Sequence, residues 1–269
     1  MREKLARWLE RWVMTKAGEI LGLGDGTRDT LLGLTVGGEG GTEEQRYRLA
    51  EALAAKVYPK YKFSELGRIF LEDEEFIALY RRAMDPDNWH SLDRKYTLYQ
   101  IARAVSFLGG DAAECGVYKG GSALLLCLAL REVGRTVHLF DSFEGLSAPE
   151  TCDGSYWSEG ALRVGEEKLR ETLAPVDNYR IYRGWIPERF PDVTDIRFSF
   201  VHIDVDIYRP TLDSLSFFYD RMLSGGVILM DDYGFSSCPG AKLAADDFFS
   251  SRPERIVMLP TGQALVIKQ

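Results

Sequence analysis

The stretch that most constrains the fold of this 269-residue chain is residues 196–234, IRFSFVHIDVDIYRPTLDSLSFFYDRMLSGGVILMDDYG. Residues 196–205 and 227–230 are rich in β-branched and aromatic side chains, which predicts two buried strands. Between them, apolar residues recur at helical spacing: Leu212, Leu215, Tyr219 and Met222. Pro210 suits the first turn of this helix, and Gly225-Gly226 suit its end. Such a strand–helix–strand unit predicts an α/β fold with a parallel sheet.

Acidic residues follow both predicted strands. Asp204 and Asp206 end the first strand, and Asp231 and Asp232 end the second. Ligands of open parallel sheets bind outside the carboxyl ends of the strands, so folding should bring these carboxylates to one rim. Like charges this close repel unless they are neutralised, and a hard divalent cation on oxygen ligands is the simplest neutraliser. We therefore predict a metal site here, with solvated loop caps as the alternative.

A glycine-rich loop forms the second informative stretch, DAAECGVYKGGS at 111–122. A short apolar strand ends in Glu114, Gly116 follows, and Gly120, Gly121 and Ser122 open a helix. Glycines let a backbone approach a ligand closely, and a helix N-terminus offers unpaired amides. The G-x-G-x-x-G fingerprint of dinucleotide sites is absent, and a purely structural turn is the alternative.

Two further strand ends are candidates for ligand contacts. The strand in TVHLFDSFEGL (136–146) ends in Asp141, about 20 residues past the glycine loop, where an acid can accept hydrogen bonds from ribose hydroxyls. A turn cap is the other role that suits Asp141. Trp185 ends the strand at 179–185, where its ring can either stack on a base or belong to the core.

The N-terminal part of the chain has a different pattern. The first ~110 residues are helical in pattern, at 43–58, 64–84 and 92–108, with a Gly- and Thr-rich segment at 21–42 that could form a lid. Residues 2–15 place apolar side chains on one helical face: Leu5, Trp8, Leu9, Trp12 and Val13. We expect this face to pack on its own domain or on a second subunit, with a membrane-surface helix as the alternative. Helices at 161–173 and 238–252, and a hairpin of strands 254–260 and 263–269, complete the pattern.

Charge and composition narrow the class of protein. A net charge of −8 argues against a nucleic-acid partner, which would require a basic surface. No apolar run approaches the ~20 residues of a membrane span, and the charged N-terminus lacks a secretory apolar region. The 4 cysteines lack metal-site spacing and fit a reducing compartment, so we expect a cytoplasmic location.

The three histidines differ in their surroundings. His138 and His202 lie inside apolar strands, where we expect satisfied core residues. His90, in NWHSLD, is the one histidine that we keep as a site candidate.

Several linked motifs resemble those of one protein family. ECGVYKGGS (114–122), LFDSFEGL (139–146), HIDVDIYRPTLDSL (202–215) and GGVILMDDYG (225–234) are similar to motifs of the macrocin O-methyltransferase (TylF/MycF/NovP-like) family. The resemblance implies a Rossmann-like class I methyltransferase sheet with a C-terminal antiparallel hairpin. We expect an N-terminal helical extension or lid at 1–91 and a methyltransferase domain at 92–269.

The resemblance also implies the site residues. S-adenosylmethionine would bind at Glu114, Gly116 and Ser122, with Asp141 on the ribose, and Mg²⁺ at Asp204, Asp231 and Asp232. We add four residues to the expected cofactor contacts: Tyr118, Gly120, Ser142 and Trp185. Tyr118 stands where many relatives have Trp.

The implied reaction is methylation of a sugar hydroxyl on a glycosylated natural product. A bound cation lowers the pKa of a coordinated oxygen, and a carboxylate can take the proton, for which Asp204 is our candidate and Asp206 our second choice. The alternatives are a catechol-type metal-dependent O-methyltransferase and a non-catalytic nucleotide-binding subunit. We expect a homo-oligomer, a dimer or higher, that acts on a small-molecule glycoside.

Overall fold

We describe the protein from a computed structural model, which places residues 12–13, 15–19, 22, 30–31, 42–58, 67, 69–83 and 90–269. The chain divides into two compact units, Met1–Glu72 and Asp73–Gln269. In the first unit, helix α3 (Glu43–Val57) begins at a capping box, in which Thr42 and Gln45 each bond the other's backbone amide. A short 3₁₀ helix, η2 (Ile69–Glu72), lies at the end of this unit.

The predicted N-terminal face lies largely outside the described residues, which include neither Leu5, Trp8 nor Leu9. Trp12 and Val13 are described, and they are 52% and 48% exposed within the single chain. Contact of this face with another subunit therefore stays a prediction.

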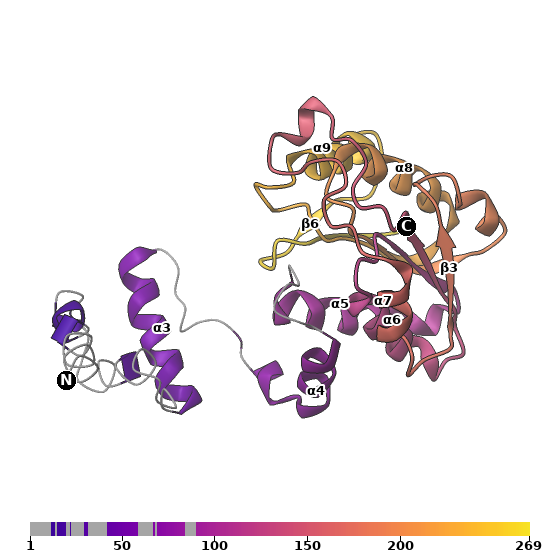
Figure 1. The fold of residues 1–269 in the computed structure, drawn as a ribbon. Helices are drawn as coiled ribbons and strands as arrows, with labels where there is room; N and C mark the ends of the chain where they lie inside the picture. The colour runs from indigo at the N-terminus through magenta and orange to yellow at the C-terminus, as the bar shows by residue number, and fades with distance from the viewer. Residues whose placement is uncertain are drawn as a thin grey trace. The chain divides into compact units, whose positions relative to one another are not determined.

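A mixed sheet forms the centre of the second unit (Figure 1). Its strands are β1 (Asp111–Cys115), β2 (Val137–Asp141), β3 (Tyr179–Arg183), β4 (Phe198–Ile203), β5 (Met222–Met230), β6 (Val257–Met258) and β7 (Ala264–Ile267). In the described part of the chain they follow the order β3-β2-β1-β4-β5-β7-β6. The first five are parallel, and β7 pairs antiparallel with both β5 and β6. The predicted α/β sheet with a C-terminal hairpin is confirmed.

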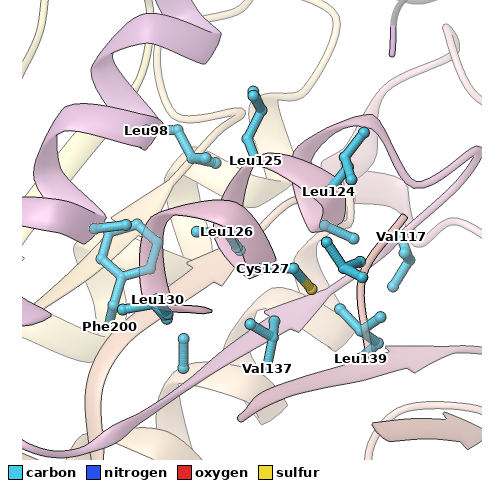
Figure 2. Close-up of a cluster of buried hydrophobic side chains, with 14 of the residues drawn as sticks. Leu98, Val117, Leu124, Leu125, Leu126, Cys127, Leu130, Val137, Leu139 and Phe200 are labelled. Carbon is cyan, nitrogen blue, oxygen red and sulfur yellow. The ribbon is translucent and has the colours of Figure 1, made fainter. Parts of the chain in front are cut away.

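Helices cover both faces of this sheet (Figure 1). The segments that follow α3 and η2 are α4 (Glu74–Ala83), α5 (Leu92–Val105), η3 (Ser106–Leu108), α6 (Gly121–Arg131), η4 (Thr151–Asp153), α7 (Glu166–Thr172), η5 (Phe190–Val193), α8 (Tyr208–Phe218), η6 (Tyr219–Arg221) and α9 (Pro239–Phe249). One core cluster joins α4–α7 to the sheet, and Figure 2 shows Leu126 and Leu130 of α6 near Phe200 and Val137. A second cluster joins α8 and α9 to the opposite face. Among the described residues, no helix has both the length and the apolar character that crossing a membrane requires.

The region around Gly225-Gly226 differs from the prediction. The helix after β4 ends at Phe218, a 3₁₀ turn follows, and β5 already begins at Met222, so both glycines lie in a strand. The cause is the C-terminal strand: Gly225 N–H donates to the Lys268 carbonyl at 2.7 Å, and Lys268 N–H donates to the Gly226 carbonyl at 2.8 Å. The pairing partner lies some 40 residues away, so the local pattern could not reveal it.

The compact unit that contains the sheet begins at Asp73 and includes α4. The expected division into an extension at 1–91 and a methyltransferase domain at 92–269 stays a prediction. Phe76 of α4 is 1% exposed, and its ring lies 4.9 Å from that of Tyr96 in α5. The role of residues 1–91 as a lid stays a prediction.

Candidate functional site

A cavity of about 300 Å³ opens at the carboxyl ends of the parallel strands. Loops after β1, β2, β3, β4 and β5 contribute to its wall, together with the residues before and at the start of α5. The predicted site residues on this wall are Gly116, Tyr118, Ser122, Asp141, Ser142, Trp185, Asp204, Asp206 and Asp232. His90, our one histidine candidate, also lines the cavity.

The glycine loop is held tightly between two strands. Gly116 has φ +81°, and a Cβ built on it would lie 1.8 Å from the carbonyl oxygen of Asp204. A side chain cannot occupy that space, so the sequence needs glycine here. Tyr118 also has a positive φ, 49°, which turns the chain toward the start of α6.

Asp141 shapes this loop directly. Its Oδ2 accepts hydrogen bonds from the backbone amides of Val117, at 2.7 Å, and Tyr118, at 3.1 Å, and its Oδ1 accepts one from Phe143 at 2.7 Å. The carboxylate still lines the cavity and has lone pairs left. Its predicted contact with a ribose stays a prediction, and the alternative role as a turn cap is observed.

Two of the predicted cofactor contacts are not on the cavity wall. Glu114 is 1% exposed, and its Oε1 lies 2.9 Å from Nδ1 of His202, while Oε2 has no hydrogen-bond partner among the described residues. Burial raises the pKa of Glu114 well above its usual range. Gly120, at φ +86°, precedes α6 and packs against Leu169. Glu114 and Gly120 therefore belong to the packing around the glycine loop and not to the residues that line the cavity.

The four predicted aspartates do gather after β4 and β5. Oδ2 of Asp232 accepts a hydrogen bond from the backbone amide of Asp206 at 2.9 Å, which holds Asp206 at φ +61°. Burial, with the neighbouring Asp204 charge, raises the pKa of Asp206 to about 7. Burial likewise raises the pKa of Asp204 and of Asp232. Such a cluster is costly in its fully charged form unless a cation lies beside it.

Possible metal-ligand atoms fall into two groups within the described residues. One group is His90, Asp204 and Asp231, and the other is Asp206, Asp232 and Cys238; in each group the atoms lie within 4.8 Å of one another. The expected set of Asp204, Asp231 and Asp232 thus draws on both groups and stays a prediction. Asp204, Asp206 and Asp232 offer hard oxygen donors on the cavity wall, which fits magnesium.

Asp231 has the most partners of the four acids. Its Oδ1 accepts from Gln263 at 2.7 Å and lies 3.2 Å from Nε2 of His202, while Oδ2 is bonded by Arg94. Asp231 is fully buried, and Arg94 neutralises its charge within the protein. The sequence argument named a divalent cation as the simplest neutraliser of these acids, and for Asp231 the protein itself supplies another, the guanidinium of Arg94.

Three basic residues, His90 before α5 and Arg94 and Lys95 in its first turn, lie near the acid cluster. The sequence argument had singled out His90 but not Arg94 or Lys95. Nε2 of His90 lies 3.9 Å from Asp204, and Nδ1 lies 3.7 Å from Asp231 and has no hydrogen-bond partner within the part of the chain that the structure describes. Burial and the nearby Lys95 and Arg94 charges lower the pKa of His90 far below its usual value, so the ring is neutral. Lys95 is 0% exposed, burial lowers its pKa to about 8, and its ammonium donates to Ser122 Oγ.

The other two histidines are satisfied core residues, as expected. His202 joins Glu114 and Asp231, as described above. His138 is 1% exposed and lies 2.9 Å from the Tyr182 hydroxyl and 3.0 Å from Asp111.

Aromatic side chains form another part of the cavity wall. Trp185 is 37% exposed and lines the cavity, so it is not simply core. Tyr156 and Trp157 pack edge to face, and the Trp157 indole donates to Cys238 Sγ at 3.4 Å. Burial raises the pKa of Cys238 to about 12, so the thiol stays protonated, and it donates to Asp206 at 3.5 Å. The cavity wall therefore combines hydroxyls, carboxylates and flat apolar surface.

Comparison with known proteins matches the same region of the chain. The family model described as Macrocin-O-methyltransferase (TylF) matches residues 95–256. The chain is 30% identical over 148 residues to the 8-demethyl-8-(2,3-dimethoxy-alpha-L-rhamnosyl)-tetracenomycin-C 4'-O-methyltransferase of Streptomyces olivaceus, covering 49% of this chain and 56% of that protein. It is 30% identical over 184 residues to the demethyldecarbamoylnovobiocin O-methyltransferase of Streptomyces niveus, covering 61% of this chain and 69% of that protein.

A solved structure shares the fold. The structure of the O-methyltransferase NovP matches with a TM-score of 0.58 at 24% identity, over 71% of this chain and 88% of that chain. The match to the tetracenomycin-type relative spans just over half of that protein's length, 56%.

Proposed function

The chain belongs to the macrocin O-methyltransferase (TylF) family, and we propose that it transfers a methyl group from S-adenosylmethionine to a sugar hydroxyl of a glycosylated natural product. The observation on which the proposal depends most is the geometry of the cavity, where the glycine loop and the buried acids meet. The contact is close: only glycine at position 116 leaves room for the Asp204 carbonyl oxygen.

The donor side of the cavity is the glycine loop and the end of β2. We propose that Gly116, Tyr118, Ser122 and Ser142 bind S-adenosylmethionine, which when bound supplies an activated methyl group on its sulfonium. Asp141, held by three backbone amides, would present its remaining lone pairs to the ribose hydroxyls. Trp185 offers a partly exposed ring at the same wall, suited to stacking on a base.

The acceptor side is the acid cluster. We propose that Asp204 and Asp232, with Asp231 behind them, would hold Mg²⁺, which when bound lowers the pKa of a substrate hydroxyl. Asp204, on the cavity wall, would then accept the hydroxyl proton. The site would hold the acceptor oxygen in place, so much of the rate enhancement would come from positioning.

The name of one relative supports a sugar acceptor. The Streptomyces olivaceus protein is named as a 4'-O-methyltransferase of a rhamnosyl tetracenomycin, and the Streptomyces niveus protein is named as the O-methyltransferase of demethyldecarbamoylnovobiocin. A catechol-type diol is the alternative acceptor, because it would use the same acids. We also propose that the protein acts as a homo-oligomer.

Methyl transfer from labelled S-adenosylmethionine to a panel of glycosides and catechols tests the proposal. We expect activity on a glycoside, loss of turnover with chelator and restoration by magnesium. Asp204→Asn should reduce the rate by at least ~10²–10⁴-fold, since it removes the proposed base and a proposed ligand together. Asp206→Asn should cost much less.

Full activity in chelator would contradict the magnesium proposal while leaving methyl transfer intact. Activity retained in Asp204→Asn but lost in Asp206→Asn would show that Asp206 is the base. Methylation of catechols alone would replace the sugar with the alternative acceptor.

A further inference from the structure

One buried carboxylate near the cavity has no role in the proposed reaction, that of Asp153. This residue ends η4, in the loop that follows β2, and it is 2% exposed. It is not one of the residues that line the cavity. Because an aspartate is almost never fully buried unless its oxygens are bonded, the partners of Asp153 indicate what it does.

The carboxylate of Asp153 joins its own loop to two helices. Oδ1 accepts a hydrogen bond from the backbone amide of Tyr208, the first residue of α8, and Oδ2 accepts one from Glu150 within the loop, each at 2.7 Å. A Cβ built on Gly240, in the first turn of α9, would lie 1.7 Å from Oδ1, so the carboxylate lies directly against the backbone of α9. The positive N-terminal ends of both helices favour a carboxylate here. Asp153 therefore fixes the loop after β2 to the starts of α8 and α9.

The same loop carries two aromatic residues of the cavity wall, Tyr156 and Trp157. Their rings pack edge to face, with centroids 4.8 Å apart. The Trp157 indole donates to Cys238 Sγ at 3.4 Å, and Cys238 donates to Asp206 at 3.5 Å. Tyr156 is nevertheless 57% exposed. The pair is thus held beside the acid cluster, on the side of the cavity proposed for the acceptor, with ring surface left uncovered.

Such an arrangement suits a ligand with a flat apolar face. Aromatic rings offer large apolar surfaces that pack well on such faces, and a glycoside has two of them, the C–H face of its sugar ring and a planar aglycone. A loop held at Asp153 and again at Trp157 presents its rings before the ligand arrives. This pre-organisation lowers the entropic cost of binding.

We propose that Asp153 is a positioning residue, which holds Tyr156 and Trp157 as a preformed wall for the flat apolar face of the acceptor. The inference rests on the proposed function, because it assigns a part of the acceptor to one wall of the same cavity. It differs from a merely structural role, in which Asp153 would only cap α8.

Two variants disturb the same contact from its two sides. Asp153→Asn keeps the size of the side chain but replaces one of its two acceptor oxygens with a donor. Gly240→Ala places a Cβ where the Asp153 carboxylate now lies. For each variant we would measure kcat and the acceptor KM at saturating S-adenosylmethionine, with the aryl glycoside of the panel above that the wild type methylates fastest. Calorimetry with S-adenosylhomocysteine would measure donor binding.

We expect both variants to raise the acceptor KM by about 3- to 10-fold, as for lost packing on an aromatic ring, with a smaller change in kcat. Affinity for S-adenosylhomocysteine should stay within a few-fold, which also shows that the variants are folded. Tyr156→Ala should raise the acceptor KM by a similar factor. In the double variant with Asp153→Asn the two factors should not multiply, because Asp153 acts through the aromatic pair.

The methyl glycoside of the same sugar, which lacks the aglycone, identifies the face in contact. A rise in KM for both glycosides would place the wall against the sugar ring. A rise for the aryl glycoside alone would place it against the aglycone.

Asp73→Asn is the matched control. Oδ1 of Asp73 accepts a hydrogen bond from the backbone amide of Phe76 at 2.9 Å at the start of α4, a helix that does not line the cavity. The variant loses a helix cap of the same kind, so we expect a lower melting temperature and an unchanged acceptor KM.

An unchanged acceptor KM in Asp153→Asn and Gly240→Ala, or equal losses of acceptor and donor binding, would overturn the inference and leave a structural cap. The same rise in acceptor KM in Asp73→Asn would also overturn it, because the effect would then follow from lower stability alone. A wild-type protein that binds no S-adenosylhomocysteine, or that methylates no glycoside, would instead refute the proposed function itself.

Discussion

Gly116→Ala should destabilise the protein and weaken donor binding, because the backbone at this position has no room to move. The new Cβ would lie 1.8 Å from the Asp204 carbonyl oxygen and 2.9 Å from the carbonyl carbon. The loop cannot shift freely, since Gly116 N–H donates to the Phe140 carbonyl at 2.9 Å and Asp204 N–H donates to the Cys115 carbonyl at 2.9 Å.

Two costs add at this position. A side chain at φ +81° costs about 1–2 kcal/mol, and overpacking adds about 1–3 kcal/mol, for a loss of about 2–5 kcal/mol in the free energy of unfolding. Gly134→Ala is the matched control, because Gly134 has φ +65° and a Cβ there would meet nothing within 4 Å. The control should lose only the backbone cost, about 1–2 kcal/mol.

Denaturant unfolding of the two variants, with the slope m compared to wild type, measures the difference. Calorimetry with S-adenosylhomocysteine should show weaker binding for Gly116→Ala and unchanged binding for Gly134→Ala. If both variants lose the same stability and bind equally well, the close approach of the glycine loop to Asp204 does not constrain the site.

Two further changes test particular side chains. Asp141→Ala removes the acceptor of three backbone amides, including that of Phe143. It should weaken S-adenosylhomocysteine binding by about 1–3 kcal/mol, measured by calorimetry in the presence of chelator. Equal affinity of the variant and the wild type would remove Asp141 from the site. Although burial raises the pKa of Glu254, hydrogen bonds from Lys268 and Tyr219 lower it to about 2. Because the folded-state pKa is depressed, the stability from Glu254 should be present above about pH 4.5 and be lost as the pH falls toward 2. Glu254→Gln should lower the free energy of unfolding by about 1.5–3 kcal/mol at pH 7. It should also make the free energy of unfolding, measured by denaturant unfolding at several pH values, depend less on pH over that acid range; an unchanged pH dependence would contradict the argument.

The local pattern of the sequence was sufficient for the elements of the sheet. Apolar runs that end in acids predicted β4 and β5, and the glycine loop predicted the turn from β1 to α6. A parallel sheet aligns the carboxyl ends of its strands, so the gathering of Asp204, Asp206, Asp231 and Asp232 also followed from the sequence. The match to the macrocin O-methyltransferase family model, at residues 95–256, includes these same motifs.

Tertiary structure decided which partner each of these groups has. Arg94 and Lys95 are part of an ordinary helical pattern in the sequence, yet α5 places both among acids that follow strands more than 100 residues later. Asp141 was predicted as a ribose acceptor, and only the folded loop shows that three backbone amides already hold it. The physical reason is range: helix and strand patterns depend on neighbours within a few residues, whereas the neutralisation of a buried charge depends on side chains that only the packed sheet brings together.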